Sequence, residues 1–161
     1  MIYGGLVLVA KMERSALSTS LLVLFVLFIV QFFLGMAQNL LIMIPMTTFP
    51  QDSSSYSNAL NYIVSGGNLA LTSHFFVDIA IIAVGIVNLA LVIHKSNVYR
   101  VLSSLSFIGV LFAFVSGLRF AAVNFSQDPI SFQMATGFMI AFVLYFVMAM
   151  LMYRDAAIQK R

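Results

Sequence analysis

Long apolar runs alternate along this chain with short polar connections. A helix needs about 20 apolar residues to cross a bilayer, because each residue adds about 1.5 Å against a hydrocarbon core of about 30 Å. Four runs reach that length, at about residues 16–44, 73–93, 98–122 and 130–153. The pattern therefore predicts an all-α integral membrane protein, an up-down-up-down bundle of four transmembrane helices forming a single membrane domain over residues 1–161.

Prolines mark two of the predicted helix boundaries. Pro45 follows the first run, and it disfavours helix in the residue before it. Asp128 and Pro129 precede the last run, and proline is favoured in the first turn of a helix. The apolar residues 1–10 are too few to cross and are followed by basic residues, so we expect an interfacial or partner-docked segment there.

The connection at residues 46–72 is the one long loop between the predicted helices. It holds a serine run at 53–55, and residues 58–65 could form a short interfacial helix before Gly66 and Gly67. No soluble catalytic domain fits in a connection of this length.

Lysine and arginine fall on alternate connections. Seven of the eight lie before the first helix, between the second and third, or after the fourth: Lys11, Arg14, Lys95, Arg100, Arg154, Lys160 and Arg161. Basic residues are retained on the cytoplasmic side of a membrane. The pattern predicts that both ends of the chain are cytoplasmic and that the 46–72 connection is outside, as in a multi-pass protein of a prokaryotic plasma membrane.

Composition excludes several kinds of chemistry. The chain is 62% hydrophobic and 8% charged, so its net charge of +3 reflects topology and gives no reason to expect nucleic acid. It has no cysteine, which removes disulfides, thiolate metal sites and cysteine nucleophiles. It also lacks a phosphate-binding glycine loop and an HExxH motif. We expect no bound metal ion and no catalytic residues.

Each predicted helix carries one small or polar face and one face rich in bulky apolar residues. Membrane helices associate through close packing of small residues and through hydrogen bonds, so the small and polar faces should meet inside the bundle. The residues concerned are Gln31, Gly35 and Gln38; His74, Asp78, Gly85 and Asn88; Ser106, Gly109, Ala113, Ser116 and Gly117; and Gln133, Gly137, Ala141 and Tyr145.

Polar residues gather at the outer ends of the predicted helices. His74 and Asp78 are four residues apart and share a helix face, while Arg119 lies near the outer end of the next helix. Ionisable groups inside a membrane usually pair, and they often serve a function. Two interpretations follow: a buried Asp78–Arg119 ion pair that fixes helix register, or a site for a ligand, proton or cofactor. The remaining members of the group are Gln38, Asn39, Asn124 and Gln133.

Short motifs in the chain resemble known membrane proteins. The segment from Gln31 to Gly35, a histidine opening the second helix and Gly117 late in the third are similar to one half of heme A synthase and to cytochrome-b-type bundles. Most of the chain resembles small uncharacterised prokaryotic four-helix membrane proteins. That similarity is carried by 34–39 with Ile44 and Pro45, by His74, by Asn124 with Asp128, and by Ser131 with Met134 and Ala135.

The resemblance to heme A synthase implies a heme b held between histidines of the second and fourth helices. His74 matches the first, but the fourth helix has no histidine, and Met134 would be the second ligand with Arg119 near a propionate. A methionine on a helix usually serves packing. The family's outer-loop glutamate and cysteines are also absent. His94 lies 20 residues beyond His74, about 30 Å along the helix.

Two functions of different classes remain. The chain could be a non-catalytic accessory subunit of a larger membrane complex, for example of respiratory type, that contacts other integral subunits and lipids as a homo- or hetero-oligomer. No cofactor is expected in that case. Alternatively, it is an electron-transfer protein that binds heme b or a quinone at an outer-side site around His74. An absorption spectrum of the purified chain would separate the two.

Overall fold

A computed structural model of the protein describes residues 2–41, 56–65, 68–123, 125 and 127–158, and it describes side chains of the first helix from Ser15 to Gln38. Every element within these ranges is a helix, and none is a strand. The five helices are α1 (Ile2–Leu41), α2 (Tyr56–Ser65), α3 (Leu69–Val92), α4 (Asn97–Ala122) and α5 (Asp128–Ile158). The all-α prediction is confirmed for this part of the chain.

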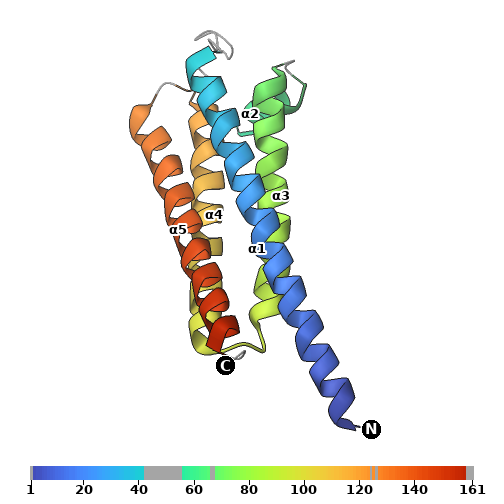
Figure 1. Ribbon diagram of the computed structural model, residues 1–161. Helices are drawn as coiled ribbons and strands as arrows, with labels where there is room; N and C mark the ends of the chain where they lie inside the picture. Colours follow the sequence, from blue (N-terminus) through green and yellow to red (C-terminus); the bar gives the residue numbers. More distant parts are fainter. Residues whose placement is uncertain (1, 42–55, 66–67, 124, 126, 159–161) are drawn as a thin grey trace.

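The four long helices lie side by side, and successive long helices run in opposite directions (Figure 1). α1 and α4 each pack against both α3 and α5, while the short α2 packs against α3 and α4. We call the end that carries α2 the α2 end, and the end that carries residues 93–96 the opposite end. The N-terminal part of α1 projects past the other helices at the opposite end (Figure 1).

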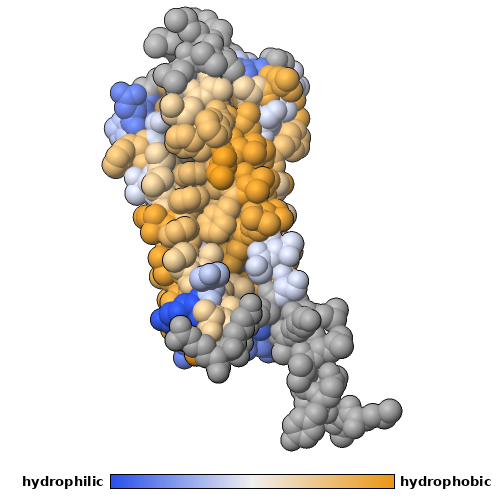
Figure 2. All heavy atoms as spheres, viewed as in Figure 1, coloured by the Kyte–Doolittle hydropathy of each residue, from blue (hydrophilic) through white to orange (hydrophobic). Residues whose placement is uncertain are grey.

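Four helical segments are long and apolar enough to cross a membrane: Ser15–Gln38 within α1, Leu69–Val92, Asn97–Ala122 and Asp128–Ile158. On the face shown in Figure 2, apolar side chains cover the middle of the bundle, and hydrophilic ones lie toward its ends. Phe33, Ile108 and Phe132 are among the large side chains that point outward. This distribution identifies a membrane protein, because lipid replaces water around the middle of the bundle.

Several helices extend beyond their predicted limits. α3 begins at Leu69 because the side chain of Asn68 caps it, accepting a hydrogen bond from the backbone N–H of Leu71 at 3.2 Å. α5 begins at Asp128, as the Asp-Pro pair predicts, but it continues to Ile158. α1 begins at Ile2, so residues 2–10 continue the first helix and do not form a separate segment.

The long connection contains the predicted short helix, which is α2. Ala59 and Ile63 of α2 are buried against Leu71, Ala121 and Ala122 of α3 and α4. The hydroxyl of Thr72 donates to the carbonyl of Ile63 at 2.6 Å and ties α2 to α3. Pro45 and the serine run at 53–55 lie outside the described residues.

Buried residues of all four long helices form the core of the bundle. It contains Leu17, Leu21, Leu24, Phe28, Ile81, Val92, Val110, Ala141, Tyr145 and Met148. The ring of Phe28 on α1 packs edge-on against Phe138 of α5, with 5.1 Å between ring centroids. Aromatic pairs of this geometry add about 0.5–1.5 kcal/mol to their burial.

α4 and α5 approach closely through glycines. A Cβ built on Gly109 would lie 3.0 Å from the carbonyl oxygen of Gly137. A Cβ on Gly137 would lie 2.9 Å from the backbone nitrogen of Ala113. These separations leave no room for a side chain, so the small faces predicted for the third and fourth helices do meet.

Candidate functional site

Residues of all four long helices line a partly open cavity of about 200 Å³ toward the α2 end of the bundle. The lining residues are Gln31, Phe32, Gly35 and Met36 of α1; His74 and Asp78 of α3; Ala113 of α4; and Met134, Ala135 and Phe138 of α5. The cavity therefore brings together two predicted cofactor-site residues, His74 and Met134, together with Asp78. It is the candidate site.

A hydrogen bond between α1 and α3 holds the polar side of the cavity. The Gln31 side-chain amide donates to the Asp78 carboxyl oxygen Oδ1 at 2.5 Å. Gln31 is 3% exposed, so this contact lies inside the bundle. Within the described residues, Asp78 thus has an amide partner from the neighbouring helix.

Two side chains of this site carry a buried polar atom that is unpaired within the described part of the chain. Gln31 Oε1 and His74 Nδ1 have no hydrogen-bond partner among the described residues. An unpaired buried polar atom costs about 1–3 kcal/mol, so such atoms call for a reason. Both belong to side chains that line the same cavity.

Two glycines lie beside the potential ligand groups. A Cβ at Gly35 would make an ordinary contact with the imidazole, 3.4 Å from His74 Cε1. A Cβ at Gly117 would lie 3.2 Å from Met134 Sδ, so the thioether lies against α4. Gly35 and Gly117 were both recognised in the sequence as small residues, but not as neighbours of His74 and Met134.

Other residues of the predicted polar group lie elsewhere. The side chains of Arg119 and Gln133 are exposed, and that of Gln38 is half-buried. The predicted Asp78–Arg119 ion pair is not present among the described residues, because Arg119 points away from the interior and Gln31 takes its place beside Asp78. The side chains of Asn39 and Asn124 lie outside the described part of the chain.

A second buried polar network crosses the bundle nearer the opposite end. The Asn88 amide nitrogen donates to Ser20 Oγ at 3.0 Å, and the Ser103 hydroxyl donates to Asn88 Oδ1 at 2.7 Å. Asn88 and Ser103 are both 0% exposed. The network joins α1, α3 and α4 and leaves both polar atoms of the Asn88 amide paired, which is typical of a structural role.

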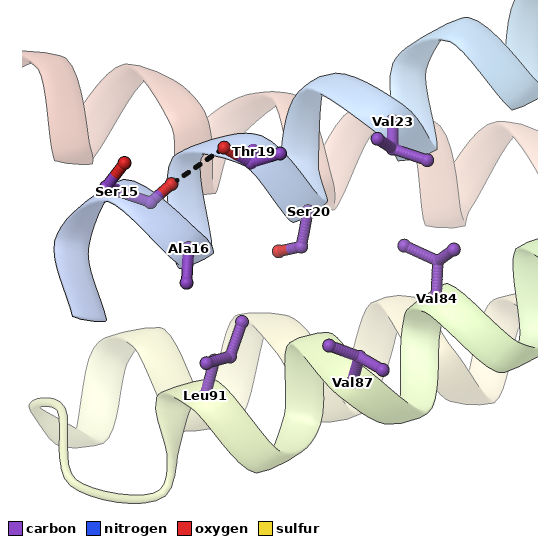
Figure 3. Close-up of a pocket in the computed structure, with 8 residues that line it drawn as sticks. All are labelled: Ser15, Ala16, Thr19, Ser20, Val23, Val84, Val87 and Leu91. Carbon is purple, nitrogen blue, oxygen red and sulfur yellow. Dashed lines mark hydrogen bonds between the residues drawn. The ribbon is translucent and has the colours of Figure 1, made fainter. Parts of the chain in front are cut away.

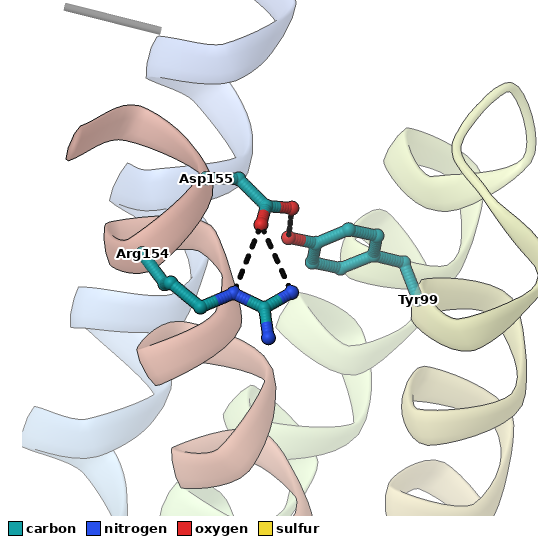
Figure 4. Close-up of polar contacts among 3 residues, drawn as sticks. All are labelled: Tyr99, Arg154 and Asp155. Atoms are coloured by element: carbon teal, nitrogen blue, oxygen red, sulfur yellow. Dashed lines mark hydrogen bonds and ion pairs between the residues drawn. The ribbon is translucent and has the colours of Figure 1, made fainter. Parts of the chain in front are cut away.

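Beyond the bundle core at that end, Asp155 connects α4 and α5. The Tyr99 hydroxyl donates to Asp155 Oδ2 at 2.8 Å, and Arg154 pairs with Asp155 Oδ1 at 3.2 Å (Figure 4). The side chain of Arg154 is 65% exposed, so its ion pair contributes little to stability. No sequence feature singles out Asp155, since its partner Tyr99 is brought to it by the packing of α4 against α5.

Two grooves flank the first membrane-spanning turns of α1. One, of about 560 Å³, lies between α1 and α3 and is lined by Ser15, Ala16, Thr19, Ser20, Val23, Val84, Val87 and Leu91 (Figure 3). The other, of about 620 Å³, lies between α1 and α5. Ser15 and Thr19 line both, and the Thr19 hydroxyl is bonded within its own helix to the Ser15 carbonyl at 2.9 Å.

Metal chemistry has no support among these side chains. The described residues contain no group of three or more histidine, cysteine, aspartate or glutamate side chains that could hold a metal ion.

Comparisons with protein-family models, with curated proteins and with solved structures found no match to this chain. The proposed function therefore depends on the geometry alone.

Proposed function

We propose that the chain is a non-catalytic accessory subunit of a larger complex in a prokaryotic plasma membrane. The observation that carries this proposal is the shape of α1. The helix has 40 residues, a length of about 60 Å, against a hydrocarbon core of about 30 Å. Its N-terminal part extends past the other helices at the opposite end (Figure 1). Grooves flank it where it leaves the other helices.

The chemistry of these grooves suits a partner helix. Membrane helices associate where small residues allow close approach and where hydroxyl groups can bond across the interface. Ser15, Ala16 and Thr19 are exposed and small, and they lie beside the apolar Val87 and Leu91 of α3. A transmembrane helix of another subunit would bury this surface and continue along α1.

The charge pattern sets the orientation in this proposal. Arg100 lies near the start of α4 and Arg154 near the end of α5, both at the opposite end of the bundle. Under the positive-inside rule that end faces the cytoplasm. The α2 end, with the candidate cavity, then lies in the outer half of the membrane.

Native electrophoresis after extraction with a mild detergent tests the accessory role. The chain should migrate with larger partners, and Thr19→Leu should release it by filling both grooves. Ser104→Leu is the matched control, because Ser104 is also an exposed hydroxyl residue on a spanning helix but lines neither groove. A wild-type chain that runs alone, or equal effects of the two substitutions, would contradict the proposal.

Heme b is the second candidate, because His74 and Met134 line one cavity and both can bind iron. The available space does not fit it. A volume of about 200 Å³ is below the roughly 300–1,000 Å³ of pockets for drug-sized ligands. No lysine or arginine lines the cavity to meet a propionate, and Arg119 is exposed. We therefore expect the purified chain to show no Soret band.

A further inference from the structure

We infer that the cavity at Gln31, His74 and Asp78 binds the ring hydroxyl of a lipid-soluble phenol, the chemical class that includes quinols. The inference concerns a ligand of the chain itself and stands apart from its role as a subunit. It rests on the unpaired atoms of the cavity, on its size and lining, and on the direction in which it opens.

The unpaired atoms define the hydrogen bonds that a ligand must make. Gln31 donates its amide to Asp78, so its Oε1 is left as an acceptor that needs a donor. His74 Nδ1 either donates or accepts, according to the tautomer of the ring. A hydroxyl group meets both needs, because it donates one hydrogen bond and accepts others. A ketone or an ether oxygen cannot satisfy Gln31 Oε1.

The size and lining of the cavity favour a single ring. An apolar cavity of about 150 Å³ is large enough to hold benzene, so about 200 Å³ admits one substituted ring. Phe32 and Phe138 line the cavity on the α1 and α5 sides, and Met36 and Met134 complete its apolar wall. Aromatic and thioether groups pack well against a planar ring.

The cavity opens between α1 and α5 toward the bilayer. Its lining residues Phe32 and Met36 are 52% and 42% exposed, and Ala135 is exposed as well. All three lie within segments able to cross a membrane, so the solvent at this rim is lipid. A ligand therefore enters from the hydrocarbon phase, which favours a lipid-soluble ring over a hydrated cation.

Calorimetric titration of the full chain in lipid nanodiscs tests the inference, with empty nanodiscs as the blank. The probes are 4-propylphenol and 4-propylanisole, in which a methyl group replaces the hydroxyl hydrogen, so that the oxygen can accept but no longer donate a hydrogen bond. We expect saturable binding of the phenol and at least about tenfold weaker binding of the anisole, the cost of one unmade buried hydrogen bond. A decyl quinol and a long-chain monophenol then distinguish the two natural sources of such a ring.

Two variants locate the binding. Ala135→Phe adds bulk at the lipid-facing rim, where folding should tolerate it, and should lower phenol affinity at least about fivefold. Ala83→Phe is its control, since Ala83 is exposed on α3 and does not line the cavity. Gln31→Met keeps the side-chain length and should remove the preference for phenol over anisole. Equal binding of both probes, no binding of the phenol, or equal effects of the two phenylalanine variants would overturn the inference.

Discussion

The Gln31 amide is the partner that Asp78 finds inside the bundle. A polar group in a bundle interior is tolerated when a neighbouring helix supplies its hydrogen bond. Gln31 is almost fully buried and reaches Asp78 from α1, whereas Arg119 is exposed on α4. The stability of the α1–α3 contact should therefore depend on Gln31 and should be indifferent to Arg119.

Substitution of Asp78 by leucine tests this pair. The change leaves the Gln31 amide without its acceptor, and we expect the free energy of unfolding to fall by about 1–3 kcal/mol. The double variant Gln31→Leu with Asp78→Leu should lose less, because no orphaned group remains. Unfolding in mixed micelles of mild and denaturing detergent measures both, and Arg119→Gln should stay within about 0.5 kcal/mol of the wild type. If Arg119→Gln lowered the free energy of unfolding as much as Asp78→Leu does, the result would support an Asp78–Arg119 ion pair instead.

The candidate site was only partly predictable at the residue scale. His74 and Asp78 stood out because ionisable residues are rare in membrane helices. The role of Gln31 was hidden, since glutamine is uncharged and its contact crosses 47 residues of sequence. Arg119 was expected beside Asp78, but its side chain is exposed in the described structure. Sequence position gives depth in the membrane but not the direction in which a side chain points.

At the scale of helices, α4 and α5 form the closest pair in the described structure. Gly109 and Gly137 bring their backbones together, so the packing depends on the absence of a Cβ at each. α1 and α3 are joined differently, through the Gln31–Asp78 contact near the α2 end and the Ser20–Asn88 contact nearer the opposite end. These two interfaces should respond to different substitutions.

Gly137→Ala should destabilise the α4–α5 pair by about 1–3 kcal/mol. Its new methyl group would meet three atoms at 2.9 Å, two of which belong to the α4 backbone and cannot move aside independently. Gly35→Ala is the control, because its methyl group would meet His74 at an ordinary contact distance of 3.4 Å. Thermal unfolding in detergent should separate the two, and an equal response would show that α4 and α5 are not tightly packed.

Asn88→Ala should weaken the association of α1, α3 and α4 by removing the hydrogen bonds of Asn88 to Ser20 and Ser103. Interhelical hydrogen bonds in membranes are worth about 0.6 kcal/mol on average, so loss of the two bonds to Ser20 and Ser103 predicts about 1 kcal/mol. Ser103→Ala removes one of the two and should cost about half as much. The same unfolding assay measures both, and an unchanged stability in Asn88→Ala would assign the network no structural role.

Helix number followed from hydropathy, but several helix ends did not. The apolar runs predicted where the chain can cross a membrane, and each of the four long helices contains such a segment. A backbone continues its hydrogen bonding until a cap or breaker stops it, which is why α3 reaches back to Asn68 and α5 continues past the predicted end at residue 153. The small faces of α4 and α5 were predictable because close approach demands glycine.

In the whole molecule, large apolar side chains lie both in the core and on the outer surface, and most of the buried polar side chains are small. Among the side chains that the structure describes, the buried polar ones are Ser20, Gln31, Asn88, Ser103, Ser106 and Ser116, while apolar ones such as Phe33 and Phe132 face outward. This arrangement explains how a chain that is 62% hydrophobic forms a defined bundle in lipid. The cavity lined by Gln31, His74 and Asp78 lies in the half of the bundle that carries α2.

The orientation of the bundle decides whether that cavity lies in the outer half of the membrane. Single introduced cysteines test this orientation directly, because the chain has no cysteine of its own. Asn58 on α2 and Ser96 between α3 and α4 are both exposed, at the two ends of the bundle. In intact cells, a membrane-impermeant maleimide should label Asn58→Cys at once and Ser96→Cys only after permeabilisation. Labelling of both positions in intact cells, or of Ser96→Cys alone, would contradict a four-span bundle with its α2 end outside.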